Sequence, residues 1–428
     1  MKNLLQKILK SISKSILKKH NPIIIGVTGS VGKTGTVEAI YHVLKNKFSV
    51  RKTIGNYNNE IGLPLTIIGE KTANRSILCW LNIFNKGIKQ IYSKDYPKIL
   101  VLEMGVDKPN DMDYLLNLAT PNISVITAIG KKPVHVEFFK SPKELVSEKT
   151  KIITNLKSTE TAILNYDDIA VRLSAKQTKA KTITFGFTKG SELQADNLTL
   201  NADFSQGQSL QGYSFKMRYQ GKEVPVRLKN IFSKTQIYAV LAAAACAISM
   251  KFNLIEISEA LYDYQSPKGR MNLIPGIKGT YLIDDSYNAS PEATLSALNV
   301  LKEIKTSGRK IACLADMLEL GTMTIEAHKD VGKSASQSAD FIVAVGKASE
   351  YIASEAIKFG FPKDKVFTFQ NSEEAGLFVQ NKILKPGDIV LIKGSQSMRM
   401  EKITKELMAE PEKAPELLVR QSTEWLKK

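Results

Sequence analysis

The sequence predicts an α/β protein with two main domains, the first built on a mostly parallel sheet. One observation is a buried-strand pattern, Pro22–Val27, that runs into a glycine-rich turn and then into a helical pattern. A second is the alternation of strand-like and helical segments further on, with core strands expected at Arg309–Leu314, Phe341–Val345 and Ile389–Ile392. The third is the length, because 428 residues correspond to two or three domains of roughly 150 residues each.

The composition is typical of a folded protein of a reducing compartment. Hydrophobic residues make up 43% and charged residues 24% of the chain, which excludes a disordered or low-complexity protein. Cys79, Cys246 and Cys313 are far apart, which argues against a disulfide framework or a cysteine-based zinc site. The longest uncharged apolar stretch, Ile237–Met250, is shorter than the roughly 20 residues of a membrane span and is predicted to be a buried helix. Because no secretory signal is visible, we expect a cytoplasmic location.

The charge of the chain favours anionic partners. Sixty Lys and Arg against 42 Asp and Glu give a net charge of +18, which attracts nucleic acid, acidic lipid and phosphorylated substrates alike. Residues 1–20 contain six lysines, no acid and an apolar stripe at helical spacing. Either this basic amphipathic helix lies on the anionic inner face of a membrane as a peripheral contact, or its stripe packs on the following domain with the lysines in water. No nucleic-acid motif is recognised, so no nucleic-acid partner is expected.

A phosphate-binding loop opens the central domain, which is therefore a P-loop domain. The predicted strand runs into Thr28-Gly29-Ser30-Val31-Gly32-Lys33-Thr34, and a helical pattern follows. Glycines let backbone N–H groups turn toward an anion, Lys33 can reach the terminal phosphates, and the Thr34 hydroxyl can ligate Mg²⁺. The strict pattern has glycine where this chain has Val27, but the order of strand, loop and helix is the expected one.

A carboxylate follows a second predicted strand. The segment Lys98–Gly105 is an apolar run that ends in Glu103 and then glycine. This places Glu103 at the carboxyl edge of the sheet, where ligands bind in open α/β folds and where a carboxylate suits Mg²⁺. The alternative is a carboxylate that caps a following helix.

The rest of the chain divides into three parts. Short alternating runs at residues 183–232 predict a small antiparallel sheet within the central domain, which spans residues 21–273. Residues 274–406 predict a smaller Rossmann-like α/β domain. Residues 407–428 form a charged tail that we expect to be helical near Glu416–Trp425.

Eight short motifs in order resemble those of one enzyme family. They are TGSVGKT, GNYNNEIGLP (Gly55–Pro64), LEMG, HVEFF (His135–Phe139), LNYDD (Leu164–Asp168), GR (Gly269–Arg270), DDSYNASPEA (Asp284–Ala293) and DMLELG (Asp316–Gly321). Any one is weak, but eight in register over residues 23–402 are specific. The chain resembles the Mur ligases, and most of all the branch that adds D-alanyl-D-alanine to the UDP-N-acetylmuramoyl-tripeptide.

The resemblance implies an ATP-dependent ligase of peptidoglycan precursor synthesis. ATP would phosphorylate a carboxylate of a muramoyl-peptide-like substrate, and the amine of an amino acid or dipeptide would attack the acyl phosphate. Phosphoryl transfer needs positioning and charge neutralisation, and we find no Ser/His/Asp or Cys/His arrangement for a protein nucleophile. The sequence does not predict the oligomeric state.

The resemblance also implies two Mg²⁺ sites. Thr34 and Glu103 would hold one ion, and His135 would ligate the second. Lys149, fourteen residues after His135, matches the family lysine that reacts with CO₂ to form a carbamate, which would ligate or orient the second ion. Taken alone, Lys149 would be an ordinary exposed helix lysine and His135 a structural histidine.

The other site residues are implied in the same way. Arg270 matches the arginine that reaches the ATP phosphates. Predicted contacts to ATP are Gly29, Ser30, Val31, Gly32, Lys33, Thr34, Gly35, Asp285, Tyr287 and Asn288, and predicted contacts to substrate are Asn58, Asn59, Glu60, Lys393, Ser395 and Arg399. Without the other motifs, the segment from Asp284 would be a plain strand-to-helix turn, and Lys393-Gly394-Ser395 an ordinary turn.

Several positions depart from the family pattern. The branch normally begins with a UDP-sugar-binding domain, whereas the phosphate loop here starts after some twenty residues, so we expect that domain to be missing. Gly35 replaces the usual threonine, and Lys131-Lys132 look inserted ahead of the metal histidine. Thr235 and Ala239 stand where the family has His and Asn, which alters the expected contacts to adenine.

Two other functions remain open from the residues. The same chemistry could act on a peptide that is not linked to UDP, or on another wall polymer. A membrane-associated binding module that uses ATP as a switch is a different class, but it would need neither the second metal site nor the C-terminal domain.

Overall fold

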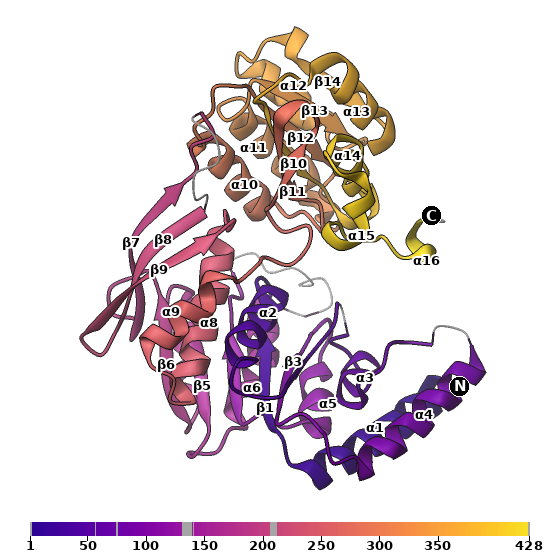
Figure 1. Cartoon of the computed structure of the whole chain (residues 1–428), viewed down its shortest axis with the longest axis vertical. Helices are drawn as coiled ribbons and strands as arrows, with labels where there is room; N and C mark the ends of the chain where they lie inside the picture. The colour runs from indigo at the N-terminus through magenta and orange to yellow at the C-terminus, as the bar shows by residue number, and fades with distance from the viewer. Residues whose placement is uncertain are drawn as a thin grey trace. The chain divides into compact units, whose positions relative to one another are not determined.

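The computed structural model describes residues 2–55, 57–73, 76–130, 139, 141–205 and 212–426. The chain forms two compact units, each with its own hydrophobic core (Figure 1). The first unit contains residues 1–198, 214–227 and 234–264, and the second contains residues 199–213, 228–233 and 265–428.

A nine-stranded sheet in the order β2-β3-β1-β4-β5-β6-β7-β8-β9 is the framework of the first unit. Its strands are β1 (Ile23–Thr28), β2 (Val50–Lys52), β3 (Ile99–Glu103), β4 (Ile123–Ile126), β5 (Thr161–Asn165), β6 (Lys181–Gly186), β7 (Leu193–Asn201), β8 (Gly212–Tyr219) and β9 (Lys222–Lys229). All pairs from β2 to β7 along this order are parallel. The predicted mostly parallel sheet is therefore confirmed.

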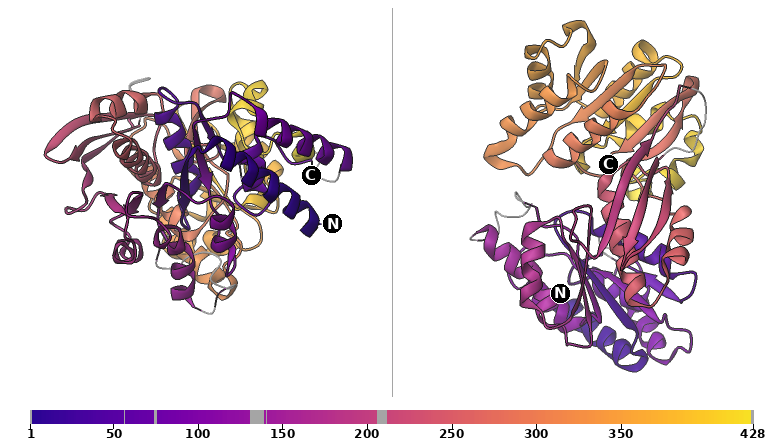
Figure 2. Two further views of the ribbon diagram at one scale, coloured as in Figure 1. Left: turned by 90° about the horizontal axis from the view of Figure 1, so that it is seen from below. Right: turned by 90° about the vertical axis from the view of Figure 1, so that its left-hand side faces the viewer.

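Helices connect and cover these strands (Figure 2). They are α1 (Lys2–His20), α2 (Lys33–Leu44), α3 (Gly62–Ile68), α4 (Ile77–Tyr92), α5 (Asp111–Leu118), α6 (Pro142–Thr154), α7 (Ile169–Ser174), α8 (Lys234–Ser249) and α9 (Leu254–Tyr262). The predicted buried helix at Ile237–Met250 corresponds to α8, which packs against α2. Parallel strands need such covering helices because both faces of the sheet are apolar.

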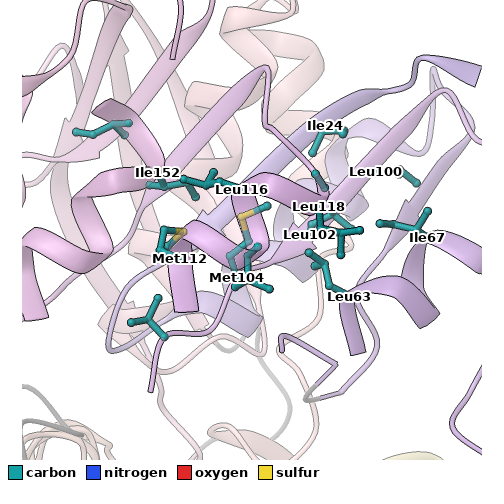
Figure 3. Close-up of a cluster of buried hydrophobic side chains, with 14 of the residues drawn as sticks. Ile24, Leu63, Ile67, Leu100, Leu102, Met104, Met112, Leu116, Leu118 and Ile152 are labelled. Atoms are coloured by element: carbon teal, nitrogen blue, oxygen red, sulfur yellow. The ribbon is translucent and has the colours of Figure 1, made fainter. Parts of the chain in front are cut away.

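One core of the first unit lies between the sheet and helices α3, α5 and α6 (Figure 3). Leu100 and Leu102 of β3 meet Leu63 of α3 in this cluster, and Met112 of α5 joins them. Ile99 and Val101, the alternate residues of β3, are also fully buried. Since successive side chains of a strand point to opposite faces, both faces of β3 are covered. This packing fixes the position of Glu103, the last residue of the strand.

The strands after β6 extend the main sheet instead of forming the separate small sheet that we predicted. The alternating pattern does give β7, β8 and β9, but β7 pairs with β6 through Phe185 and Leu193. Gln220 and Gly221, which join β8 to β9, both have positive φ, 48° and 76°, as a tight hairpin requires. Alternation identifies strands but does not say which sheet edge they join.

Residues 2–20 form a helix whose apolar stripe packs on the first unit. Leu9 and Ile16 of α1 are fully buried in the same cluster as β3. A Cβ built on Gly87 of α4 would lie 2.7 Å from Ile12, so α1 lies directly against α4. Of the two interpretations of residues 1–20, the structure supports the packed stripe.

The second unit contains the predicted Rossmann-like sheet, in the order β10-β11-β15-β12-β13-β14. Its strands are β10 (Asn272–Gly276), β11 (Thr280–Asp285), β12 (Lys310–Ala315), β13 (Phe341–Val345), β14 (Val366–Phe369) and β15 (Ile389–Lys393). Its helices are α10 (Pro291–Glu303), α11 (Thr324–Ala335), α12 (Glu350–Lys358), α13 (Ser372–Phe378) and α14 (Glu401–Leu407). β10 is antiparallel to β11, and every other pair is parallel.

The tail is helical near Glu416–Trp425, as predicted, but not as one continuous helix. It forms two short helical turns, α15 (Ala414–Leu417) and α16 (Thr423–Leu426). Arg420, between them, has φ of 57°, which no α-helix can accommodate. Within the described part of the chain, no helix is long and apolar enough to cross a membrane.

Candidate active site

The phosphate loop lies between β1 and α2, and two glycines shape it. Gly29 and Gly32 have φ of 146° and 86°, values that favour glycine. A Cβ on Gly29 would lie 2.1 Å from the Thr127 hydroxyl oxygen, so no side chain fits there. Because α2 begins at Lys33, its first backbone N–H groups and the positive end of its dipole face the loop.

The end of β4 holds the loop in place. The backbone N–H groups of Ser30 and Val31 both donate to the Ala128 carbonyl, over 2.6 and 3.4 Å. The Thr127 hydroxyl donates to the Val31 carbonyl over 2.6 Å. The ammonium of Lys33 donates to the Gly29 carbonyl over 2.9 Å and so lies across the loop. Sequence reasoning missed Thr127 and Ala128, because only tertiary packing brings them to the loop.

Thr34 and Glu103 meet beside the loop. The Thr34 hydroxyl donates to Oε2 of Glu103 over 2.9 Å. The Asn58 side-chain amide donates to Oε1 over 3.0 Å, and the Thr53 hydroxyl accepts from the Glu103 backbone N–H over 2.9 Å. The carboxylate is only 3% exposed, so these contacts fix its orientation. Asn58 thus orients Glu103, while its predicted contact to substrate stays a prediction, and Thr53 was not predicted.

Lys149 is a buried lysine beside the same loop. It projects from α6 and is 2% exposed, with Nζ 3.4 Å from the Gly29 carbonyl oxygen and 3.5 Å from that of Val106. Burial, and then the nearby positive charge of Lys33, lower the pKa of Lys149 to about 7. Near neutral pH a large fraction of this amine is therefore uncharged and nucleophilic.

Three other predicted residues of the first unit have structural contacts. The Asn59 side chain accepts from the backbone N–H of Gly62, over 3.0 Å, at the start of α3. Glu60 accepts from Gln6 of α1 over 3.1 Å. A Cβ on Gly35 would lie 2.9 Å from Oε1 of Gln236, so this glycine allows α2 to approach α8 closely.

The predicted departures from the family pattern lie partly outside the described residues and partly in α8. His135 and the Lys131-Lys132 pair lie outside the described residues. Thr235, at the start of α8, is next to the loop, since its Cγ2 would lie 3.8 Å from a Cβ on Gly32. Ala239 is 2% exposed within α8.

A second cluster of predicted residues forms within the second unit. The Arg270 guanidinium stacks on the Tyr287 ring, 4.3 Å from its centroid. Lys393 forms an ion pair of 2.7 Å with Asp285 and donates to the Asn288 carbonyl over 3.0 Å. Asp285 ends β11 and Lys393 ends β15, and these strands are parallel neighbours, so the pair lies at the carboxyl edge of the sheet.

Ser395 and Arg399 lie after β15. The Ser395 hydroxyl accepts from the Leu318 backbone N–H over 2.9 Å. Arg399 forms an ion pair of 2.6 Å with Glu401 and donates to the Trp425 carbonyl over 3.1 Å. Arg420 pairs with the other oxygen of Glu401 over 2.8 Å. Sequence reasoning missed Glu401 and Arg420, which no local pattern identifies.

Comparison with protein families identifies the family of this chain. The model of the Mur ligase middle domain matches residues 27–79 and 84–247. The model of the Mur ligase, glutamate ligase domain matches residues 269–396. The chain belongs to the Mur ligase family. It is therefore an ATP-dependent ligase that forms amide bonds, as the resemblance implied.

Relatives of this Mur ligase are similar over most of their length. A UDP-N-acetylmuramoyl-tripeptide–D-alanyl-D-alanine ligase of Bacillus subtilis is 30% identical over 405 residues, 94% of this chain and 79% of its own. A ligase of the same name from Buchnera aphidicola is 30% identical and covers 95% of this chain and 80% of its own. A MurF ligase of Thermotoga maritima, solved in complex with ADP, is 25% identical with a TM-score of 0.74 and covers 95% of this chain and 84% of its own.

The donor atoms beside the phosphate loop of this Mur ligase fit Mg²⁺. A hydroxyl and a carboxylate are hard oxygen ligands, which Mg²⁺ prefers, and it binds through one or two protein groups together with substrate phosphates. Thr34 and Glu103 provide such a pair within 2.9 Å of each other. Among the described residues there is no group of three or more His, Cys, Asp or Glu side chains that could hold a metal ion.

Proposed function

We propose that this Mur ligase joins D-alanyl-D-alanine to the carboxylate of a muramoyl-tripeptide in peptidoglycan precursor synthesis. The activity is the one in the names of the Bacillus subtilis and Buchnera aphidicola relatives. The observation that carries the proposal is the site around the loop, where Lys33, the Thr34–Glu103 pair and the buried Lys149 lie together. A nucleotide switch without ligation has no use for a buried lysine of lowered pKa beside its phosphate site.

The first step transfers a phosphoryl group. A carboxylate oxygen of the peptide attacks the γ-phosphorus of ATP, the bond from that phosphorus to its bridging oxygen breaks, and ADP leaves. The first backbone N–H groups of α2 and the Lys33 ammonium hold the phosphates and offset the charge that builds up on them. Thr34 and Glu103 would hold one Mg²⁺, which when bound neutralises phosphate charge.

The second step forms the amide bond. The dipeptide amine attacks the acyl carbon of the mixed anhydride, and a tetrahedral intermediate forms. The bond from carbon to the phosphate oxygen then breaks, phosphate leaves, and the amine loses a proton. The protein's part is to hold the two reactants in line, which alone can lower a barrier substantially.

Lys149 takes part as a carbamate in this proposal. Its ammonium loses a proton, and the neutral amine then attacks CO₂ and loses a second proton, so that an anion replaces the buried cation. Within the described residues, Nζ lies near two carbonyl oxygens, at 3.4 and 3.5 Å, and burial disfavours the charged form of the amine, so the exchange relieves an unfavourable charge. The carbamate and His135 would hold a second Mg²⁺.

The second cluster contacts the nucleotide and the incoming amine in this proposal. Arg270 supports this role, because its Nε is buried and makes no hydrogen bond to any described residue, so a phosphate oxygen could accept from it. Asp285, Tyr287 and Asn288 would contact the nucleotide, as expected from the resemblance. Lys393, Ser395 and Arg399 would lie near the amino substrate.

We also propose that the enzyme works as a cytoplasmic protein with a peripheral contact at the inner face of the membrane. The apolar stripe of α1 is buried, but four lysines of that helix are exposed, namely Lys7, Lys14, Lys18 and Lys19. Each lysine close to an anionic lipid surface contributes about 1 kcal/mol of attraction.

A phosphate-release assay tests the reaction. Muropeptide donors with and without UDP are each mixed with ATP, with and without D-alanyl-D-alanine. We expect phosphate release only when donor and dipeptide are both present, and a product heavier than the donor by one dipeptide residue unit. Activity with UDP-free donors alone would redirect the proposal to another wall peptide, and release without any acceptor would refute ligation of this kind. Lys33→Ala is the inactive control.

A further inference from the structure

Helix α4 presents an apolar face to solvent. Ile77, Leu78, Leu81, Ile88 and Tyr92 are 69%, 78%, 56%, 50% and 78% exposed. Four of them recur at spacings of four, seven and four residues, which places them on one stripe of the helix, with Leu78 beside it. We refer to these five residues as the α4 face.

The packing of α4 does not account for this face. Only Ile83 and Gly87 of the helix are buried, and neither lies on the stripe. Trp80 and Phe84 are half-buried against the core and form the border between the packed side and the α4 face. Isolated exposed apolar residues are ordinary, but five on one helix mark a surface that is covered by something else.

The helix of the α4 face and its neighbour α1 carry basic and no acidic side chains. Helix α1 lies alongside α4 (Figures 1 and 2), and the His20 ring bonds the Gln90 carbonyl over 2.8 Å. Neither α1 nor α4 contains an acidic residue. Exposed lysines on these helices include Lys7, Lys18 and Lys89.

We propose that the α4 face docks this protein on an anionic lipid bilayer, with lysines of α1 and α4 on the headgroups. An apolar stripe bordered by an aromatic side chain and lysines is the pattern of helices that lie in the plane of a membrane interface. The charge selects this occupant over a second copy of the chain, because two copies joined through the α4 face would bring their lysine-rich helices together. The proposal does not depend on the ligase reaction, and it places the inserted residues on α4 instead of residues 2–20.

Vesicle co-sedimentation of the full-length protein tests the docking surface. The vesicles are phosphatidylcholine alone and phosphatidylcholine mixed with phosphatidylglycerol, at low and high salt. We expect binding to the anionic vesicles, weakened by salt. The affinity of the variant Leu78→Ser/Leu81→Ser for the vesicles should be at least about tenfold lower than that of wild type. The control Ile169→Ser/Leu173→Ser, on α7 at 56% and 58% exposure, should bind like wild type.

Charge reversal provides the second arm. Lys7→Glu/Lys18→Glu should weaken binding about tenfold or more, and Lys179→Glu/Lys189→Glu, at two exposed lysines elsewhere, should weaken it clearly less. Trp80 gives a direct readout, since the chain has 2 tryptophans and Trp425→Phe leaves only this one. Its emission should shift to the blue on anionic vesicles and be quenched by brominated lipid.

Three results would overturn the proposal. One is no binding to anionic vesicles, and another is equal binding by wild type and Leu78→Ser/Leu81→Ser. The third is a wild-type dimer, detected by sedimentation velocity, that the same two substitutions dissociate, because the α4 face would then be covered by a second copy. Unfolding midpoints and phosphate release close to wild type establish that the variants are folded.

Discussion

Nζ of Lys149 lies 3.4 Å from the carbonyl oxygen of Gly29, so a buried amine sits directly beneath the phosphate loop. Burial and the charge of Lys33 lower the pKa of this amine to about 7. The position of Lys149 thus links the loop that binds phosphate to a group whose charge can be changed by CO₂. Three predictions concern this residue.

Replacing Lys149 by alanine should lower the rate of phosphate release at least about a hundredfold, since a ligand or orienting group of the metal site is lost. Acetate or formate should restore part of the rate by supplying the missing carboxylate. Lys143→Ala, at an exposed lysine of the same helix, should stay within about twofold of wild type. An unchanged rate in Lys149→Ala would refute the carbamate.

The rate of wild type should depend on dissolved CO₂ at constant pH. At pH 7 the uncharged fraction of Lys149 is large, so purging CO₂ should lower the rate and bicarbonate should restore it. The uncharged fraction rises as the pH increases through about 7, and the rate in bicarbonate should rise with it. A rate that ignores CO₂ across this range would contradict the proposal.

The stability of the apo protein should rise with pH above about 7 when CO₂ is excluded. The folded pKa of Lys149 is about 7 against an ordinary value of 10.5, so the unfolded chain binds more protons between these pH values. The unfavourable contribution of Lys149 is therefore complete below pH 7 and disappears toward pH 10.5. Lys149→Met should be more stable than wild type by urea unfolding at pH 7, and its advantage should shrink by pH 10.

Asn58→Ala should raise the Mg²⁺ concentration needed for half-maximal rate by about tenfold or more. Asn58 donates to Oε1 of Glu103 over 3.0 Å. Without Asn58 the carboxylate is still present, but its orientation is no longer fixed by this hydrogen bond. High Mg²⁺ should recover most of kcat, whereas Glu103→Gln should not recover. Equal Mg²⁺ curves for wild type and Asn58→Ala would refute this positioning role.

Glu401→Gln should destabilise the second unit by about 3 kcal/mol. The carboxylate is 1% exposed and pairs with both Arg399 and Arg420, so the substitution leaves two cations without their counter-charge. Urea unfolding at pH 7 in a Trp80→Phe background, followed by emission of Trp425, measures the effect. Glu412→Gln, at an exposed carboxylate of the tail, is the control and should change stability by less than about 0.5 kcal/mol.

The sequence was sufficient to predict β1, the loop and α2, because their signals are local. A buried strand, glycines that tolerate positive φ and a lysine at the helix start follow one another within a few residues. Glu103 could be predicted as well, since the end of an apolar strand determines where the next side chain emerges.

Other parts depend on contacts between distant residues. Lys149 is buried because α6 packs beneath the loop, and the local sequence SEKTK does not predict this burial. The same holds for the pairing of β7 with β6 and for the packing of α1 against α4 beside Gly87. Alternation and helical spacing identify a strand or an amphipathic helix, but they do not show which surface it packs against. The break at Arg420 has a similar origin, because its ion pair with Glu401 fixes a left-handed residue between two helical turns.

The burial of Leu9 and Ile16 has a practical consequence for protein engineering. A shortened protein that starts at β1 and lacks α1 would expose apolar side chains of α3 and α4. Such a protein would tend to aggregate. Affinity tags and fusion partners attached ahead of residue 2 should leave the first helix whole.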